Sequence, residues 1–197
     1  GGTSGSILGD VVNNGTLAFN RADNVTFGGT VSGSGMLVQL GPGILTLTAN
    51  NTYSGNTIVA AGSLEVGNGG TSGSIAGDVQ NNGSLAFNRA DTLVYGGTVS
   101  GNGALTKAGA GMLTLTGNSS YSGNTIVAAG ILNVAGSLGQ TAVSVNSGAT
   151  LLGSGTIAGP VTVQSGGILS GASGTTFGMG ALTLNGGATT NVLINGP

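Results

Sequence analysis

The chain of 197 residues contains two copies of one long sequence unit. Residues 1–68 and residues 69–136 align end to end without a gap, and about 47 of the 68 aligned positions are identical. The strings GGTSGSI, NNG and LAFNRAD recur at this constant offset. A fixed period of this kind is typical of repeat architectures, in which successive units stack and share one core. The repeat therefore favours a stacked array over an irregular globule.

Short apolar or β-branched runs, each bounded by Gly or Asn, recur through the first unit. They cover residues 17–19, 25–27, 37–38, 44–47, 57–59 and 64–66. Runs of three to five such residues between turn formers are typical of strands. Three coils per unit would give about 23 residues each, within the range of solenoid repeats. We therefore predict an all-β fold, a parallel β-solenoid of about eight or nine coils.

Composition excludes several other classes of protein. The 43 glycines oppose helix formation, whereas 39% hydrophobic residues give a core that a disordered chain lacks. No apolar run approaches the roughly 18 residues of a membrane helix. Three basic residues and a net charge of -2 exclude a nucleic-acid partner, because phosphate neutralisation needs many cations.

The constant offset leads to a prediction about stacking. If each unit holds three whole coils, equivalent residues lie on the same face of the solenoid, three coils apart. The alternation from Ile44 to Thr48 has period two, so we expect Leu45 and Leu47 to point inward. The core is expected to consist of like residues layered over like: Leu17 with Leu85, Phe19 with Phe87, and Ile58 with Ile126.

The segment that follows the two units leaves the 68-residue register but keeps its style. Strands are expected at 142–145, 148–152, 155–157, 161–163, 167–169, 181–184 and 192–194, in smaller coils. No polar or Pro-rich linker precedes them. We therefore predict repeat units at 1–68 and 69–136, and coils at 137–197 that continue the same solenoid. The first residues lack a signal peptide's basic and apolar regions, so we expect a processed chain or a fragment.

Two stretches resemble the passenger-associated β-strand repeat of Gram-negative autotransporters. The better copy is Gly101 to Leu132, GNGALTKAGAGMLTLTGNSSYSGNTIVAAGIL. Gly33 to Leu64 is a looser copy, with Val38-Gln39-Leu40 and Pro42 in place of Thr106-Lys107-Ala108 and Ala110. The run from Val145 to Gly167 is similar to the C-terminal passenger segment that precedes the membrane barrel of this family.

The resemblance implies a right-handed parallel β-helix that is exported through the outer membrane of a Gram-negative bacterium and displayed at the cell surface or secreted. It implies a membrane barrel downstream and no membrane contact by this segment. The partners expected are a cell-surface protein or glycan, or other passengers through self-association.

Residues for catalysis or metal binding are scarce. The chain has no His, Cys or Trp, which excludes a Ser-His-Asp triad and most metal sites. We predict no catalytic, cofactor-binding or metal-binding residue. Asp10 and Asp78 are expected about 14 Å apart on one face, farther than paired glycosidase carboxylates. Three other pairs are placed within reach across a coil: Asp10 with Asp23, Glu65 with Asp78, and Asp91 with Lys107.

Three repeated polar features allow a structural and a functional interpretation. Arg21 with Asp23, repeated as Arg89 with Asp91, is expected to be an exposed salt bridge and alternatively a ligand-binding stripe.

Tyr53 and Tyr121 are expected to pack at a corner with the hydroxyl at the surface, and alternatively to form a platform for sugar. The Asn pairs 13–14 and 81–82, each followed by Gly, are expected at corners that need positive φ, and alternatively to act in recognition.

These observations predict a non-catalytic, rigid β-helical stalk that acts as an adhesin or self-association module. The alternative is a β-helix enzyme that acts on polysaccharide with surface carboxylates.

Overall fold

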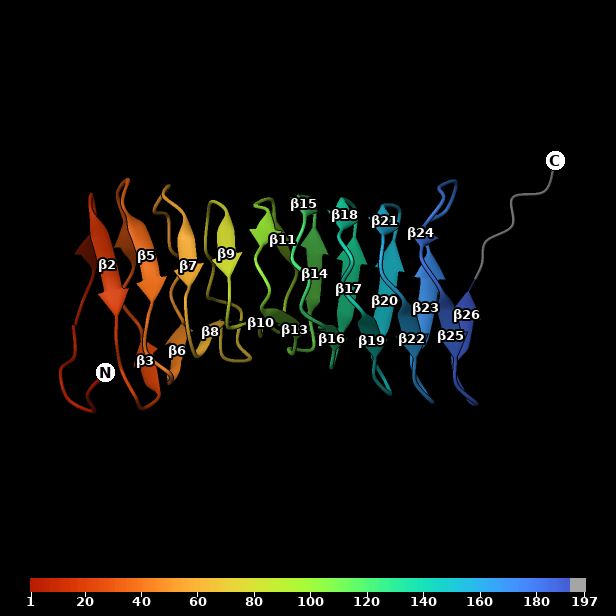
Figure 1. Ribbon diagram of the computed structural model, residues 1–197, viewed down its shortest axis with the longest axis horizontal. Helices are drawn as coiled ribbons and strands as arrows, with labels where there is room; N and C mark the ends of the chain where they lie inside the picture. Colours follow the sequence, from red (N-terminus) through yellow and green to blue (C-terminus); the bar gives the residue numbers. More distant parts are fainter. Residues whose placement is uncertain (192–197) are drawn as a thin grey trace.

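The protein is a rod of stacked β-coils. The computed structural model describes residues 1–191, which form 26 short strands and no helix. Figure 1 shows the coils side by side along the long axis, with the N-terminus at one end and the last strands at the other. All strand pairs are parallel, and the rod has about nine turns. This confirms the prediction of an all-β, parallel β-solenoid; the strand predicted at 192–194 lies outside the described residues.

Each coil contributes strands to three faces. The first face carries β2 (Thr16–Phe19), β5 (Met36–Gln39), β7 (Thr57–Val59), β9 (Val79–Asn81), β12 (Val99–Ser100), β15 (Asn118–Ser119), β18 (Ser137–Leu138), β21 (Thr156–Ile157) and β24 (Gly178–Met179). Two sheets meet on it where the Val99 amide donates to Ser119 Oγ at 3.0 Å.

The second face is one unbroken nine-stranded sheet. It contains β3 (Val25–Phe27), β6 (Ile44–Leu47), β8 (Ser63–Val66), β10 (Ser84–Phe87), β13 (Ala104–Lys107), β16 (Thr125–Val127), β19 (Val143–Val145), β22 (Val161–Val163) and β25 (Leu182–Leu184). The sheet crosses from the repeated units into the segment after residue 136.

The third face is less regular. It contains β1 (Val11–Val12), β4 (Val31–Ser32), β11 (Leu93–Tyr95), β14 (Met112–Leu115), β17 (Ile131–Val134), β20 (Thr150–Gly153), β23 (Ile168–Gly171) and β26 (Thr189–Asn191). Between β4 and β11, residues 67–75 form a Gly-rich loop with no named strand.

The length of a coil corrects the stacking prediction. On the second face Val25 pairs with Leu45, Leu45 with Leu64, and Leu64 with Leu85. Three coils therefore take the chain only from Val25 to Leu85, which is less than one full repeat unit. The expected coil length is too long, and each unit contains three coils and one further face. The coils of the later segment are shorter still, as the pairing of Val143 with Val161 shows.

Because of this extra face, equivalent residues of the two units do not stack. Leu17 lies on the first face and pairs with Leu37, whereas Leu85 lies on the second and pairs with Leu64 and Leu105. Phe19 and Phe87 are separated in the same way, and so are Ile58 and Ile126, which pair with Val38 and Thr106. The prediction that these pairs stack is wrong.

The core follows the period-two alternation of the strands. Leu45 and Leu47 are buried, as predicted, while Ile44 at the start of the same strand is 37% exposed. Each unit also packs one aromatic pair between neighbouring strands. The ring centroids of Phe19 and Phe27 lie 5.6 Å apart, and those of the equivalent Phe87 and Tyr95 lie 5.4 Å apart.

The corners need Gly for space more often than for its backbone freedom. A Cβ on Gly97 would lie 2.1 Å from the carbonyl oxygen of Gly77 in the preceding coil. Gly15 does not adopt positive φ, and no residue other than Gly does so among residues 1–191. The expectation of positive φ at the corners 13–15 and 81–83 is therefore wrong; a positive φ occurs instead at Gly33 and Gly101.

Candidate functional site

The repeated Arg is the most connected polar side chain of each unit. Arg89 donates to both carboxylate oxygens of Asp91, at 2.8 and 2.7 Å. Its other bonds reach back into the Gly-rich loop, to the carbonyls of Gly73 at 2.8 Å and Thr71 at 2.6 Å. The side chain of Arg89 is only 10% exposed. The ion pair is thus present as predicted, but its guanidinium is buried and fastens a loop.

The first unit repeats this arrangement, in which one Arg pairs with an Asp and also donates to two carbonyls of a preceding loop; we call it the Arg clamp. Arg21 bonds both oxygens of Asp23 and donates to the carbonyls of Thr3, at 2.9 Å, and Gly5. The hydrogen bonds from Arg21 hold the pKa of the Asp23 carboxyl below its ordinary value. The two clamps lie at different corners, because one precedes the second face and the other the third. They do not form a continuous ligand-binding stripe.

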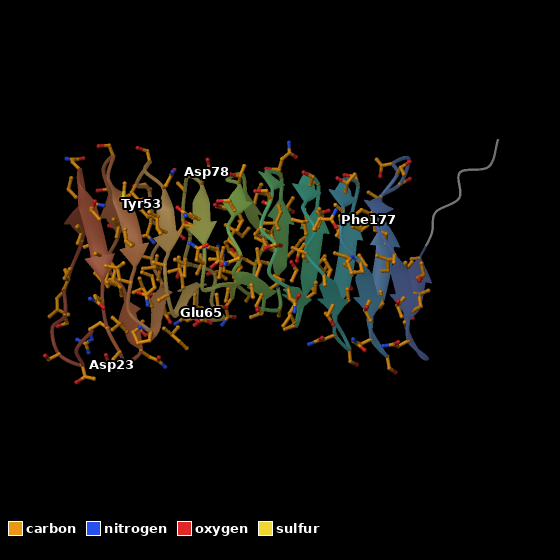
Figure 2. All side chains as sticks on the ribbon, in the orientation of Figure 1. Asp23, Tyr53, Glu65, Asp78 and Phe177 are labelled. Atoms are coloured by element: carbon orange, nitrogen blue, oxygen red, sulfur yellow. The ribbon has the colours of Figure 1, made fainter. Side chains whose placement is uncertain are left out.

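The other repeated carboxylates connect successive coils. Asp10 accepts a bond from the Thr30 amide at 2.7 Å, and Asp78 accepts the equivalent bond from Thr98 at 2.8 Å. The Thr30 amide lowers the pKa of Asp10. Figure 2 shows Asp78 and Asp23 at opposite margins of the rod. Asp10 and Asp78 belong to different faces, which corrects their expected alignment on one face.

Glu65 and the corner asparagines also bond to neighbouring coils. Glu65 accepts from Thr46 at 3.2 Å and from Asn88 at 2.7 Å. Asn13 accepts from the Gly15 amide at 3.1 Å and donates to the Met36 carbonyl at 2.9 Å, and Asn81 does the same with Gly83 and Ala104. The asparagines at 13 and 81 are buried corner residues. This agrees with the structural interpretation.

Lys107 lies inside the solenoid. It is 2% exposed, and its Nζ donates to the carbonyls of Gly109 and Ala129. Burial lowers the pKa of this ammonium. Gln39, at the equivalent position of the first unit, donates to the carbonyls of Gly41 and Gly43, both at 2.9 Å. The expected approach of Lys107 to Asp91 is wrong, because the alternation of side chains along β13 directs Lys107 into the core.

The repeated tyrosines are core residues. Tyr53 and Tyr121 are fully buried, and their hydroxyls bond Thr57 at 2.5 Å and Thr125 at 2.6 Å. Burial raises the pKa of each phenol to about 12. The predicted packing of both rings is confirmed, but their hydroxyls lie inside the protein and not at the surface as expected. A buried ring cannot serve as a platform for sugar, so the alternative interpretation is wrong.

All eight charged side chains therefore bond to other parts of the chain. Asp10 with Asp23, and Glu65 with Asp78, have separate partners and do not act on each other. No cluster of three or more metal-binding side chains occurs among residues 1–191. In the same range no helix is long and apolar enough to cross a membrane.

The exposed surface is aliphatic, hydroxyl and amide in character. Along the second face the outward row contains Thr26, Thr46, Glu65, Ala86, Thr106, Ile126, Ser144, Thr162 and Thr183. Val94 on the third face is 63% exposed. The prediction that Ile126 stacks with Ile58 in the core is wrong, since Ile126 is 37% exposed. The exposure of Val94 was not expected either, because a single Val or Ile in an alternating strand indicates core until its register is known.

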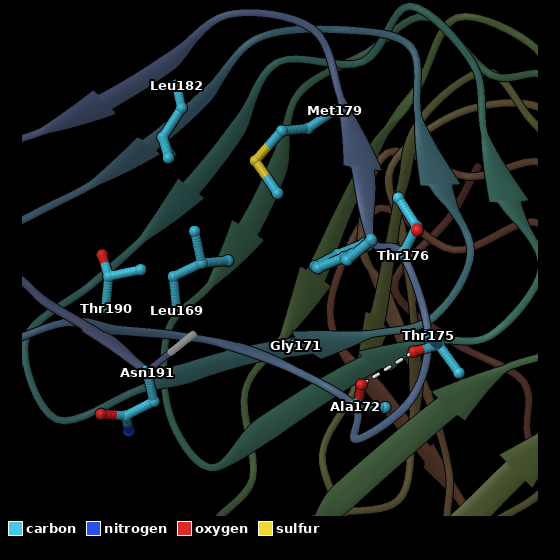
Figure 3. Close-up of a pocket in the computed structure, with 10 residues that line it drawn as sticks. Leu169, Gly171, Ala172, Thr175, Thr176, Met179, Leu182, Thr190 and Asn191 are labelled. Carbon is cyan, nitrogen blue, oxygen red and sulfur yellow. Dashed lines mark hydrogen bonds between the residues drawn. The ribbon is translucent and has the colours of Figure 1, made fainter. Parts of the chain in front are cut away.

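A cavity of about 340 Å³ lies among the last coils. Figure 3 shows Leu169, Met179 and Leu182 around it, with Thr175 donating to the Ala172 carbonyl at 2.9 Å in the adjoining turn. None of its lining residues is charged. The cavity therefore adds no acid, base or metal ligand to the surface.

Comparison with known proteins gives the family. The passenger-associated-transport-repeat matches residues 37–66 and 105–134, two stretches separated by the same offset as the sequence units. The first stretch begins in β5 and ends with β8, and the second begins in β13 and ends with β17. The chain is 40% identical to the adhesin BmaC autotransporter of Brucella suis biovar 1 (strain 1330) over 93 residues, which is 47% of the chain's length. The chain is part of an autotransporter passenger.

The passenger is also 44% identical, over 73 residues and 37% of its length, to an extracellular serine protease of Serratia marcescens. It spans 3% of the adhesin and 7% of the protease. No solved structure matches it. Autotransporter passengers are displayed at the surface of Gram-negative bacteria or secreted through the outer membrane, and this is the location of the passenger described here.

Proposed function

We propose that this segment is a non-catalytic, rigid stalk that contributes to adhesion, by contact with a cell-surface protein or glycan or with a second passenger. One observation carries the proposal: the charged side chains bond within the chain. Arg21 and Arg89 fasten loops, Asp10 and Asp78 connect coils, and Lys107 is buried. Acid–base catalysis needs a titratable group that is directed at a substrate.

The surface supports contact through shape and neutral hydrogen bonds. The outward row of the second face offers mostly Thr and Ser hydroxyls, with Ile126 37% exposed among them. Such a surface attracts no charged partner over a distance, because long-range steering depends on a field of one sign. Many weak contacts repeated along a rod raise the overall affinity through multivalency.

The two named relatives bear differently on this proposal. The adhesin autotransporter supports an adhesive passenger. The protease activity belongs to the Serratia protein as named; this chain has no His, so its own residues do not make a Ser-His-Asp triad.

The test removes whole coils from the full-length passenger. Deletion of residues 25–84 lets Leu85 take the place of Val25 on the second face, because the two are separated by three coils in register. We expect the shortened passenger to reach the surface, measured with an epitope tag, and to lose adhesion to host cells or autoaggregation. Full adhesion and autoaggregation at equal display would contradict the proposal.

A second assay addresses the alternative of a polysaccharide-acting enzyme. The full passenger and its Glu65→Gln and Asp78→Asn variants are incubated with a panel of polysaccharides, and new reducing ends are measured. We expect no cleavage by any of the three. Cleavage that is lost in either variant would overturn the non-catalytic assignment and favour the enzyme.

A further inference from the structure

Five Asn-Gly pairs lie within residues 1–191, at 14–15, 68–69, 82–83, 102–103 and 185–186. An Asn side chain followed by Gly is prone to a covalent rearrangement, since Gly has no Cβ to hinder approach of its backbone nitrogen to the Asn Cγ. The reaction is favoured where the Gly N–H donates no hydrogen bond and where the segment is accessible to water. The fold decides which pairs meet these conditions.

Four of the five glycines use this N–H in a hydrogen bond. The amides of Gly15 and Gly83 donate to Asn side chains at 3.1 and 3.2 Å. Those of Gly69 and Gly103 donate to backbone carbonyls of other coils, both at 2.8 Å. Each nitrogen must first give up its acceptor, so the fold protects these four pairs.

Gly186 is different because of its place in a turn. The Ala188 amide donates to the Asn185 carbonyl at 2.9 Å, which makes Gly186 the second residue of a four-residue turn. The amide of this position takes no part in the turn's own hydrogen bond. The Gly186 nitrogen donates to no acceptor among the residues that the structure describes. Asn185 and Gly186 are both exposed, and a Cβ on Gly186 would meet no atom within 4 Å.

The same turn occurs in the two preceding coils, where the chemistry is less favourable. It spans Asn146 to Ala149, with a bond of 3.1 Å, and Gln164 to Gly167, with a bond of 2.9 Å. Ser follows the amide residue in both. Only the third turn combines Asn, a following Gly and an N–H without an acceptor in residues 1–191.

We propose that Asn185-Gly186 is a site of spontaneous deamidation in the folded protein. The Gly186 nitrogen forms a bond to Asn185 Cγ, the Cγ–Nδ2 bond breaks, and ammonia leaves with the proton lost by the Gly186 nitrogen. Water then opens the resulting succinimide at either carbonyl. The products are aspartate and isoaspartate, the latter with one extra carbon in the backbone.

The product changes the local contacts as well as the charge. Asn185 Nδ2 now donates to Gln164 Oε1 at 2.7 Å, and Gln164 Nε2 donates to Ser144 Oγ at 3.3 Å. A carboxylate at 185 has no proton to donate, so Gln164 must turn its amide to donate from Nε2, and the Ser144 hydroxyl must then change from acceptor to donor. The net charge of the chain, -2 before the reaction, becomes one unit more negative.

The test is peptide mapping of the folded, full-length passenger after incubation in mildly alkaline buffer. Mass spectrometry measures the exchange of NH2 for OH at each Asn, and chromatography separates the isoaspartyl product. We expect residue 185 to react at least about tenfold faster than the Asn of the other four pairs, each of which must first break a hydrogen bond. In denaturant all five pairs should react at similar rates.

Two variants show the origin of the reaction. Gly186→Ala fits the turn without a clash, and its methyl group should slow deamidation at 185 while circular dichroism stays unchanged. Asn185→Gln should abolish isoaspartate at this turn. The proposal is overturned by similar rates at all five pairs in the folded chain, by faster reaction at another pair, or by an undiminished rate in Gly186→Ala.

Discussion

Leu17 and Leu85 occupy the same position of the 68-residue repeat, yet they lie on different faces of the solenoid. Leu17 pairs with Leu37 on the first face, and Leu85 pairs with Leu64 and Leu105 on the second. Three coils take the chain from Val25 to Leu85, which is short of one repeat unit. The remainder of each unit advances the chain by one face. Equivalent surface residues are consequently presented in different directions along the rod.

The Arg89 clamp should stabilise the Gly-rich loop that it holds. Arg89→Ala removes the partner of Asp91 and the donors to the Gly73 and Thr71 carbonyls, and we expect a loss of about 2 to 4 kcal/mol. Urea unfolding measures the loss, and hydrogen exchange locates it. Arg89→Lys keeps the charge but lacks the planar guanidinium, so its free energy of unfolding should lie between those of the unsubstituted chain and Arg89→Ala. Unchanged exchange of the amides of residues 69–75 in Arg89→Ala would refute the clamp.

Two adjacent glycines give a matched test of close coil packing. A Cβ on Gly97 would lie 2.1 Å from the Gly77 carbonyl oxygen, whereas one on Gly96 would meet nothing nearer than 3.7 Å. Gly97→Ala should cost about 2 to 4 kcal/mol in the free energy of unfolding, and Gly96→Ala about 0.5 kcal/mol or less. Thermal unfolding of both variants checks this. Equal stability of the two would show that the coils are not spaced as described.

Lys107 should make stability depend on pH below its ordinary pKa of 10.5. Burial lowers the pKa in the folded chain, so the unfolded chain binds more protons in this range, and the free energy of unfolding rises as pH rises toward 10.5. Denaturant titrations at a series of pH values measure the slope. Lys107→Gln, which reproduces the residue at 39, should remove the rise; an identical slope in that variant would exclude Lys107 as its source.

Tyr53 and Tyr121 should have the opposite effect at higher pH. Their pKa is about 12 in the folded chain and 10.0 ordinarily. The folded chain therefore keeps protons that the unfolded chain loses, and stability falls between about pH 10 and 12, by roughly 3 kcal/mol per Tyr at most.

Tyrosinate absorbance and unfolding followed together test this expectation. The Tyr53→Phe/Tyr121→Phe double variant is the control and should lose less stability over the same range. Ionisation of all three tyrosines near pH 10 in a chain that remains folded would contradict their burial.

The sequence was sufficient for the strands and the inward side of the core. Alternation placed Leu45 and Leu47 inside, and Gly marked most corners. The number of residues per coil was not available from it, because the repeat length is not a whole number of coils. If a repeat unit is longer or shorter by one face, the alternation within each strand is unchanged, but the strand lies on another side of the solenoid.

The polar residues were harder to place for a related reason. Arg89 and Lys107 look like surface residues by type, but both are buried against backbone carbonyls. The Thr residues that bond the Tyr53 and Tyr121 hydroxyls lie four positions later, at Thr57 and Thr125. The inward direction of each Tyr and of its Thr partner was not evident before the register of the strands was known.

The rotation of one repeat unit by one face is tested most directly by distances between spin labels. The protein has no Cys, so two double variants can be labelled cleanly: Ala18→Cys/Gln80→Cys, and Ala18→Cys/Ala86→Cys. Ala18 and Gln80 lie three coils apart in one column, through Val38 and Ile58, about 14 Å along the rod. Ala18 and Ala86 are repeat equivalents on different faces.

Dipolar spectroscopy on the folded chain should give a clearly longer distance for the pair 18/86 than for the pair 18/80. A distance for 18/86 equal to that of the single-column pair 18/80 would place the repeat equivalents on one face and contradict this arrangement.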